Sequence, residues 1–163
     1  MNSIFKRVSV RHFQDREVEN DKIELLLRAA MASPSAKNQQ PWRFIVVTDK
    51  EKIKELSDCS IYAKFAQNAP LIIVVLYDSS NLAAEEYVEI DCAICTENIL
   101  LEACELGLGG TMIGICPNEE RMDNVRKVLD LDEITPFTII PIGYPLKDRE
   151  QMDRFDKSKI TYI

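Results

Sequence analysis

The sequence lacks a long apolar run and has one histidine among its 163 residues. Its longest apolar stretch, "PLIIVVLY" at 70–77, is less than half of the roughly 20 residues that cross a bilayer. The opening "MNSIFKRVSVRHF" has no continuous apolar segment of the kind that a secretory signal needs, so we expect a cytoplasmic protein. No low-complexity tract or internal repeat is present.

The cysteine count and the net charge exclude further classes of protein. An odd count of five cysteines, without a signal sequence, favours reduced thiols over a disulfide framework. The formal net charge of -7 makes nucleic acid a poor partner, because binding it requires a concentrated basic surface. Residues 1–14 are an exception, since they carry Lys6, Arg7 and Arg11 and no acid.

The scarcity of histidine limits the chemistry that side chains can perform. No Ser-His-Asp set can be assembled around His12, and the carboxylates form no pair that stands out from solvated helix faces. Cys92 and Cys95 form a C-x-x-C pair, but they lack a second pair at zinc spacing and lie on the apolar stripe of a helix. Core packing therefore explains them better than redox chemistry or zinc. The sequence predicts no catalytic side chain.

What is present is an alternation of helical and strand patterns, which predicts one α+β domain over residues 1–163 with a sheet between helix layers. The predicted helices cover 21–32, 50–56, 61–67, 82–106 and 118 to about 129. The predicted strands cover 43–47, 71–77 and 137–144, and 111–115 is a further candidate. The segment 145–163 has little apolar periodicity; it is either a solvated tail, which composition favours, or an arm that packs on a partner subunit.

Three stretches carry candidate binding residues. In an extended segment Arg7, Ser9 and Arg11 share one face, where two guanidiniums and a hydroxyl suit a phosphate dianion; the alternative is an exposed basic N-terminus. The loop from Pro34 to Trp42 concentrates side-chain amides that match a flat ring with polar edges, or it is an ordinary helix-to-strand connection. The glycines of "ELGLGG" at 105–110 end a helix, or they let bare backbone approach a ligand.

Together these stretches resemble the FMN-dependent nitroreductase family. The matching segments are "RVSVRHF", "SPSAKNQQPWRFIVV", "LEACELGLGGTMIG" and "IGYP" followed by "DRFDKSKI", in an order that runs from residue 4 to about 160. The resemblance implies a three-layer sandwich with a mixed, mainly antiparallel sheet. It also implies a homodimer with FMN at the subunit interface and a C-terminal arm that reaches the partner.

The resemblance also implies the binding residues. Arg7, Ser9 and Arg11, with Arg154, would hold the FMN phosphate of one subunit. The flavin ring would meet residues of the other subunit and a few further positions, which are Pro34, Ser35, Ala36, Asn38, Gln40, Lys64 near the pyrimidine edge, and Gly110. Val8 departs from the family's second arginine, and the chain lacks the long insertions that form substrate lids in larger members.

The implied activity is hydride transfer from NADH or NADPH through the flavin to a nitroaromatic, quinone or similar electrophile, with ping-pong kinetics. Such an enzyme needs no acid–base set of its own, because the cofactor performs the redox chemistry. The same fold would also accommodate reductive dehalogenation, flavin breakdown or a flavin-binding module without turnover. The sequence leaves the physiological acceptor and the choice of nicotinamide open.

Overall fold

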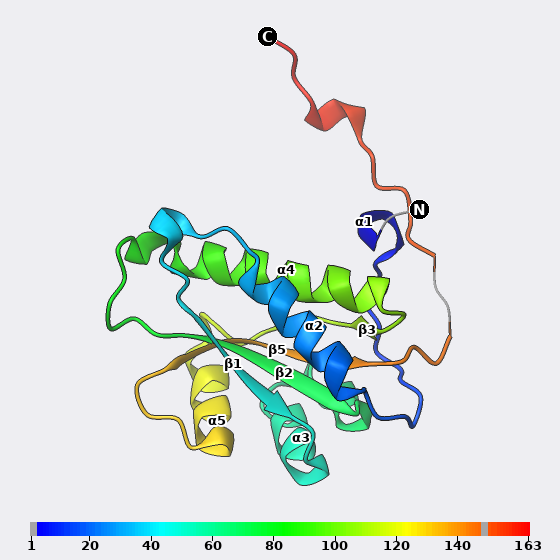
Figure 1. The fold of residues 1–163 in the computed structure, drawn as a ribbon, viewed down its shortest axis with the longest axis vertical. Coiled ribbons are helices and arrows are strands. Elements are labelled where there is room, and N and C mark those ends of the chain that lie inside the picture. The colour runs from blue at the N-terminus through cyan, green and yellow to red at the C-terminus, as the bar shows by residue number, and fades with distance from the viewer. Residues whose placement is uncertain (1–2, 148–149) are drawn as a thin grey trace.

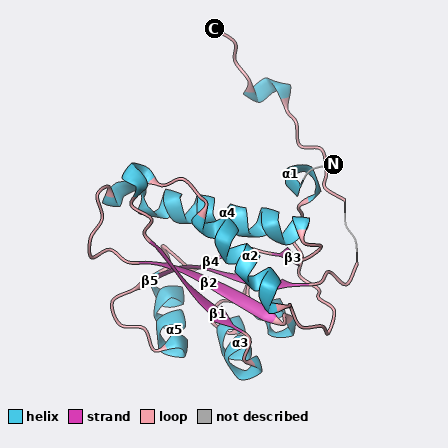
Figure 2. Cartoon of the chain, viewed as in Figure 1, coloured by secondary structure: helices cyan, strands magenta, loops and turns pink. Residues whose placement is uncertain are grey.

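A five-stranded antiparallel sheet forms the centre of the computed structural model, which describes residues 3–147 and 150–163 (Figures 1 and 2). Four strands lie in the order β1-β2-β5-β3, and the remaining strand, β4, also pairs with β5. The strands are β1 (Trp42–Val47), β2 (Leu71–Tyr77), β3 (Gly109–Gly110), β4 (Ile113–Gly114) and β5 (Thr135–Gly143). The named strands all pair in antiparallel fashion, and one isolated parallel bridge joins Ser9 to Gly110. The described sheet is therefore mainly antiparallel, as predicted.

Helices cover both faces of the sheet and complete three layers (Figure 1). One face carries α2 (Asn20–Met31) and the long α4 (Val88–Glu105), and the other carries α3 (Lys50–Ser57) and α5 (Glu119–Leu129). The short α1 (Ser3–Lys6) lies beside α4. Four 3-10 helices complete the set: η1 (Ala36–Asn38), η2 (Lys64–Asn68), η3 (Glu85–Tyr87) and η4 (Lys157–Lys159). The predicted α+β sandwich is confirmed.

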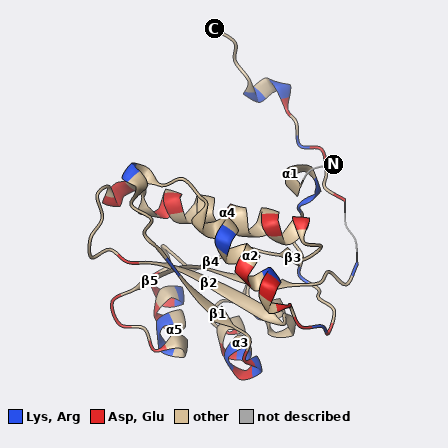
Figure 3. Cartoon of the chain, in the orientation of Figure 1, with Lys and Arg blue, Asp and Glu red and all other residues tan. Residues whose placement is uncertain are grey.

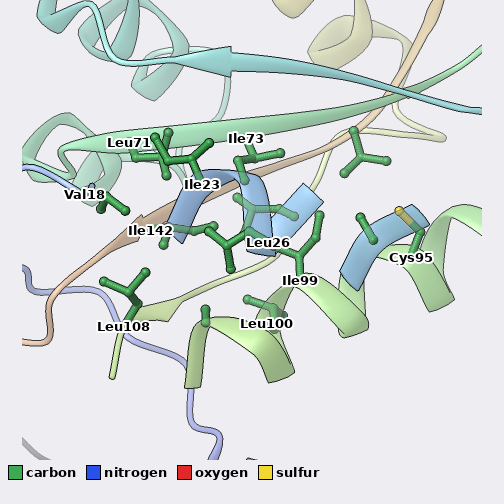
Figure 4. Packing of buried hydrophobic residues seen from close by; sticks show 14 of the residues in the cluster. Val18, Ile23, Leu26, Leu71, Ile73, Cys95, Ile99, Leu100, Leu108 and Ile142 are labelled. Atoms are coloured by element: carbon green, nitrogen blue, oxygen red, sulfur yellow. The ribbon is translucent and has the colours of Figure 1, made fainter. Parts of the chain in front are cut away.

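The central strand β2 shows why this sequence forms a sandwich. Successive side chains of a strand point to opposite faces, and β2 is apolar at every position up to Leu76. Leu71 and Ile73 belong to the core under α2 and α4, shown in Figure 4, whereas Ile72 and Val74 belong to the core under α3 and α5. A strand buried on both sides needs this continuous run.

Two predicted helices are shorter than expected. The segment 82–106 becomes regular α-helix only at Val88, after the 3-10 turn η3. One reason is that the backbone N–H and C=O of Ala84 both bond the side chain of Gln39. The predicted helix at 61–67 is the 3-10 helix η2, and the candidate strand at 111–115 contributes only β4.

The chain after β5 leaves the body of the molecule. Gln151 ties it to the N-terminal segment, because its side-chain amide donates to the carbonyls of Ile4 and Arg7, both at 3.2 Å. Beyond this point the chain runs outward to the C-terminus (Figure 1). Of the helices in the described part of the chain, none combines the length and hydrophobicity needed to span a membrane.

Candidate functional site

The N-terminal segment lies along the edge of the sheet, where it takes an extended course. The N–H of Val10 donates to the Gly110 carbonyl at 3.0 Å, and the Thr111 hydroxyl donates to the Val10 carbonyl at 2.7 Å. Val10 is buried, whereas Arg11 is exposed. The predicted alternation therefore holds at these two residues, whereas Arg7, Val8 and Ser9 are all half-buried.

Arg7 stands at the start of this segment, between α4 and a cavity of about 510 Å³. Its Nε lies 3.0 Å from Oε1 of Glu97 on α4, and 22% of its side chain is exposed. Gly110, Lys6 and Lys147 also line the cavity. The structure thus brings Arg7 and Gly110 to one cavity, with Ser9 bridged to Gly110 by its backbone.

Arg11 and Lys64 have other partners than Arg7. The Arg11 guanidinium lies over the Phe65 ring, 5.8 Å from its centre, and Arg11 lines a different cavity of about 850 Å³. Lys64, the neighbour of Phe65, forms an ion pair with Asp58. The two arginines of the predicted cradle therefore face different partners on either side of Ser9. Four residues of extended chain separate them by roughly 13 Å.

The loop between α2 and β1 has an unusual backbone. Lys37, Asn38 and Gln40 have φ angles of 49°, 54° and 45°, in the left-handed region that residues other than glycine rarely occupy. Such conformations cost of order 1–3 kcal/mol each and persist only where surrounding contacts enforce them.

Gln39 and Asp91 are the contacts that hold this loop. The Gln39 amide donates to an oxygen of Asp91 at 2.7 Å and to the Ala84 carbonyl at 2.9 Å, and its own oxygen accepts from the Ala84 N–H. The other oxygen of Asp91 accepts from the Ala36 N–H at 2.9 Å. Asp91 is only 2% exposed. The side-chain amide of Gln39, one of those that the sequence suggested for ring binding, instead bonds Asp91 and Ala84 within the protein.

The remaining polar groups of the loop are partly free. Ser35 accepts from the Gln40 N–H at 3.1 Å, and the oxygen of Asn38 accepts from the Gln40 side chain at 2.9 Å. Asn38, Gln40 and Pro34 are exposed. Trp42 is buried in the core under α2 and α4.

The loop and Arg7 are held at different points of α4, the loop in its first turn and Arg7 near its middle. Asp91 holds the loop and Glu97 contacts Arg7. Six residues of helix separate these acids by about 9 Å along the axis. Sequence reasoning missed both acids, although Asp91 had one signal: it is a carboxylate beside the apolar stripe of Val88, Cys92 and Cys95.

The glycines after α4 are explained by the protein itself. Gly107 has a φ of 74° and turns the chain after the helix. A Cβ on Gly109 would lie 2.4 Å from a methyl group of Val10, and one on Gly110 would lie 2.9 Å from the Pro141 carbonyl oxygen. Close approach does require these glycines, but the approaching groups are the N-terminal segment and the sheet.

Arg154 and the cysteines complete the predicted set. Arg154 is exposed, three residues after the contact that Gln151 makes with the N-terminal segment. Cys92 and Cys95 are fully buried in the core, as predicted. Burial raises the pKa of the Cys95 thiol to about 12 and that of the Cys92 thiol further still, so neither is a reactive thiolate at neutral pH.

Comparisons with known proteins agree with this architecture. The profile of the Nitroreductase family matches residues 4–63 and 57–144. A relative from Archaeoglobus fulgidus, named "Putative NADH dehydrogenase/NAD(P)H nitroreductase", is 40% identical over 98% of this chain and 95% of its own. A solved structure from Clostridium acetobutylicum, a "Putative NADH Oxidase", is 46% identical with a TM-score of 0.96 and covers 98% of both chains. An "FMN-dependent Nitroreductase" from Clostridium difficile is 32% identical, covers 99% of this chain and 97% of its own, and has a TM-score of 0.91. The chain belongs to the nitroreductase family.

Proposed function

We propose that the whole chain, residues 1–163, is one FMN-binding domain that passes a hydride from NADH or NADPH to a nitroaromatic, quinone or similar electrophile. The observation that carries the proposal is the strained loop with exposed Asn38 and Gln40, locked to α4 by Gln39 and Asp91. Strain of this kind is typical of ligand-binding sites. The names of the relatives from Archaeoglobus fulgidus and Clostridium difficile support the same chemistry.

The residues present fit a cofactor with an anionic end. A phosphate monoester brings about two negative charges, which a protein of net charge -7 can bind only through a local group of cations. Arg7 and Ser9 would hold the phosphate, joined by Arg11 once its guanidinium leaves the Phe65 ring and by Arg154 from the C-terminal segment. Arginine is suited to this task because its planar fork donates two parallel bonds to phosphate oxygens.

The ring would meet the loop of a second copy. Its contacts would come from Pro34, Ser35, Ala36, Asn38 and Gln40, with Lys64 near the pyrimidine edge and the backbone of Gly110 nearby.

Two apolar surfaces support the homodimer. Helix α4 exposes Ile90 and Ile94 on the side that faces away from the sheet, and Ile90 is 54% exposed. Figure 3 shows few charges along this helix compared with α3 and α5. The C-terminal segment also exposes Met152 and Phe155, the latter by 75%. Apolar surface of this extent on an arm and a helix is typical of chain–chain contact, so we propose that the arm packs on the partner.

Bound FMN would supply the hydride transfer, and the side chains would bind and orient the reactants. Within the described residues, no cluster of His, Cys, Asp and Glu has a metal-binding arrangement. One cleft would receive the nicotinamide and then the acceptor, which predicts parallel lines in double-reciprocal plots. Intersecting lines would contradict this order.

A visible spectrum of the purified protein, repeated after addition of FMN, tests the cofactor. Protein that stays colourless refutes the proposal. Stopped-flow mixing of the yellow protein with NADH and with NADPH then tests the activity. Bleaching by one or both supports an oxidoreductase, and its absence with both supports a flavin-binding module without turnover. Product analysis with nitroaromatic, quinone and halogenated acceptors separates the proposed activity from dehalogenation.

A further inference from the structure

The ion pair between Arg7 and Glu97 leaves most of the guanidinium available. The contact joins Nε of Arg7 to Oε1 of Glu97 at 3.0 Å. Across the described ranges 3–147 and 150–163, the two terminal nitrogens of Arg7 donate no hydrogen bond. A guanidinium held at Nε can still present its terminal edge, which is the edge that grips two oxygens of one phosphate.

The setting of Glu97 explains why this contact exists. Glu97 is exposed on α4 in line with Ile90, Ile94 and Leu101, at helical spacings that place all four on one side. A carboxylate on an apolar helix face is costly to cover unless it has a cationic partner. Arg7 is that partner, and its guanidinium comes from the segment that carries Ser9.

We propose that Glu97 is a positioning residue for the phosphate end of the cofactor. It fixes the Arg7 guanidinium by Nε against α4 and so directs the terminal nitrogens toward the phosphate. This inference rests on the proposed function, because it takes Arg7 as a phosphate ligand. It gives each α4 a task at each of the two shared sites, since Asp91 holds the loop that meets one flavin ring and Glu97 holds the arginine that meets the other cofactor's phosphate.

The inference predicts a change in FMN affinity opposite to the one that simple electrostatics predicts. Removing a negative charge near an anion site should strengthen anion binding by Coulomb's law. If Glu97 positions Arg7, neutralising it should weaken binding instead, because Arg7 then loses its fixed orientation. If Glu97 only competes with the phosphate for Arg7, neutralising it should strengthen binding.

The experiment measures the affinity of the dimer for FMN and for riboflavin, which lacks the phosphate, by quenching of flavin fluorescence. Glu97→Ala is expected to weaken FMN binding about 5- to 20-fold, and Glu97→Gln about 2- to 5-fold, because glutamine keeps an oxygen in the position that now lies 3.0 Å from Nε. Riboflavin affinity should stay unchanged in both variants. The matched control is Glu102→Gln, which makes the same charge change on α4 at a side chain without a polar partner among the described residues. FMN affinity should stay unchanged there.

Three results would overturn the inference: unchanged FMN affinity in both Glu97 variants, tighter FMN binding, or equal losses for FMN and riboflavin, which would indicate a general structural effect. A double-mutant cycle with Arg7→Ala separates this inference from the proposed function. Arg7→Ala alone should weaken FMN about 10- to 100-fold, and in that background Glu97→Ala should have no further effect. If Arg7→Ala leaves FMN affinity unchanged, the proposed phosphate site fails; if only the Glu97 variants fail, the site stands without this residue.

Discussion

Asp91→Asn is expected to destabilise the protein through the loop between α2 and β1. The variant keeps one oxygen for the Ala36 N–H but turns an amide donor toward the Gln39 amide, where Asp91 now accepts a bond of 2.7 Å. Gln39 cannot turn its amide around to relieve this, because both of its ends already bond the backbone of Ala84. One bond to a charged acceptor is lost without replacement.

Such a bond contributes about 1.5–3 kcal/mol, and the free energy of unfolding should fall by this amount. With a slope of roughly 1–3 kcal/mol per molar urea, the midpoint of urea unfolding should drop by about 1 M at an unchanged slope. Circular dichroism at fixed protein concentration measures this, since the proposed dimerisation would make the stability depend on concentration.

The loop itself gives a second readout. Exchange of the Ala36 amide hydrogen should accelerate in Asp91→Asn, because this N–H then donates to a neutral oxygen and the loop has lost the bond from Gln39. Glu102→Gln is the matched control and should match the wild type in both measurements. The reasoning is refuted if Asp91→Asn is as stable as Glu102→Gln, or if its Ala36 amide remains equally protected.

Three further predictions concern packing, pH and assembly. Gly109→Ala places a Cβ 2.4 Å from a Val10 methyl group and should lower the free energy of unfolding by about 1–3 kcal/mol. Gly114→Ala is the control, because no atom lies within 4 Å of the added Cβ, and it should be neutral in the same urea assay. Tyr144→Phe removes the hydrogen bond that chiefly lowers the pKa of Glu19 from 4.5 to about 2; a carboxyl NMR titration should show this pKa rising. Because the folded-state pKa of Glu19 is lowered, its contribution to the free energy of unfolding is complete above pH 4.5 and is lost as the pH falls toward 2. The stability difference between Tyr144→Phe and the wild type should therefore shrink over that window. A constant difference would contradict the assignment. Deletion of residues 147–163 should loosen the dimer in sedimentation experiments, and a fully dimeric truncated protein would return the segment to the solvated-tail interpretation.

Much of the fold was predictable because its signals are local. The run "LIIVVLY" predicted a strand buried on both faces, and the apolar positions of α4 predicted its buried stripe. The start of α4 was predicted too early because the Gln39 side chain hydrogen-bonds the backbone N–H and C=O of Ala84. A contact across 45 residues leaves no trace in local periodicity.

The candidate site was predictable only in its composition. The segment around Ser9 and the loop around Asn38 were singled out by residue type, but the sequence could not show that Arg7 faces Glu97 while Arg11 faces Phe65. Nor could it show that Gly109 makes room for Val10. The assignment of these residues to a flavin stays a prediction.

The sequence by itself determined the order of the elements, the two buried faces of the sheet and the membership of the family, because these depend on the spacing of residues along the chain. The tertiary structure decided which polar side chains hold the protein together and which stay exposed. Gln39 is bound by Asp91, 52 residues away, while Asn38 beside it remains exposed. Two neighbouring amides have the same chemistry, and only the contacts that folding creates can distinguish them.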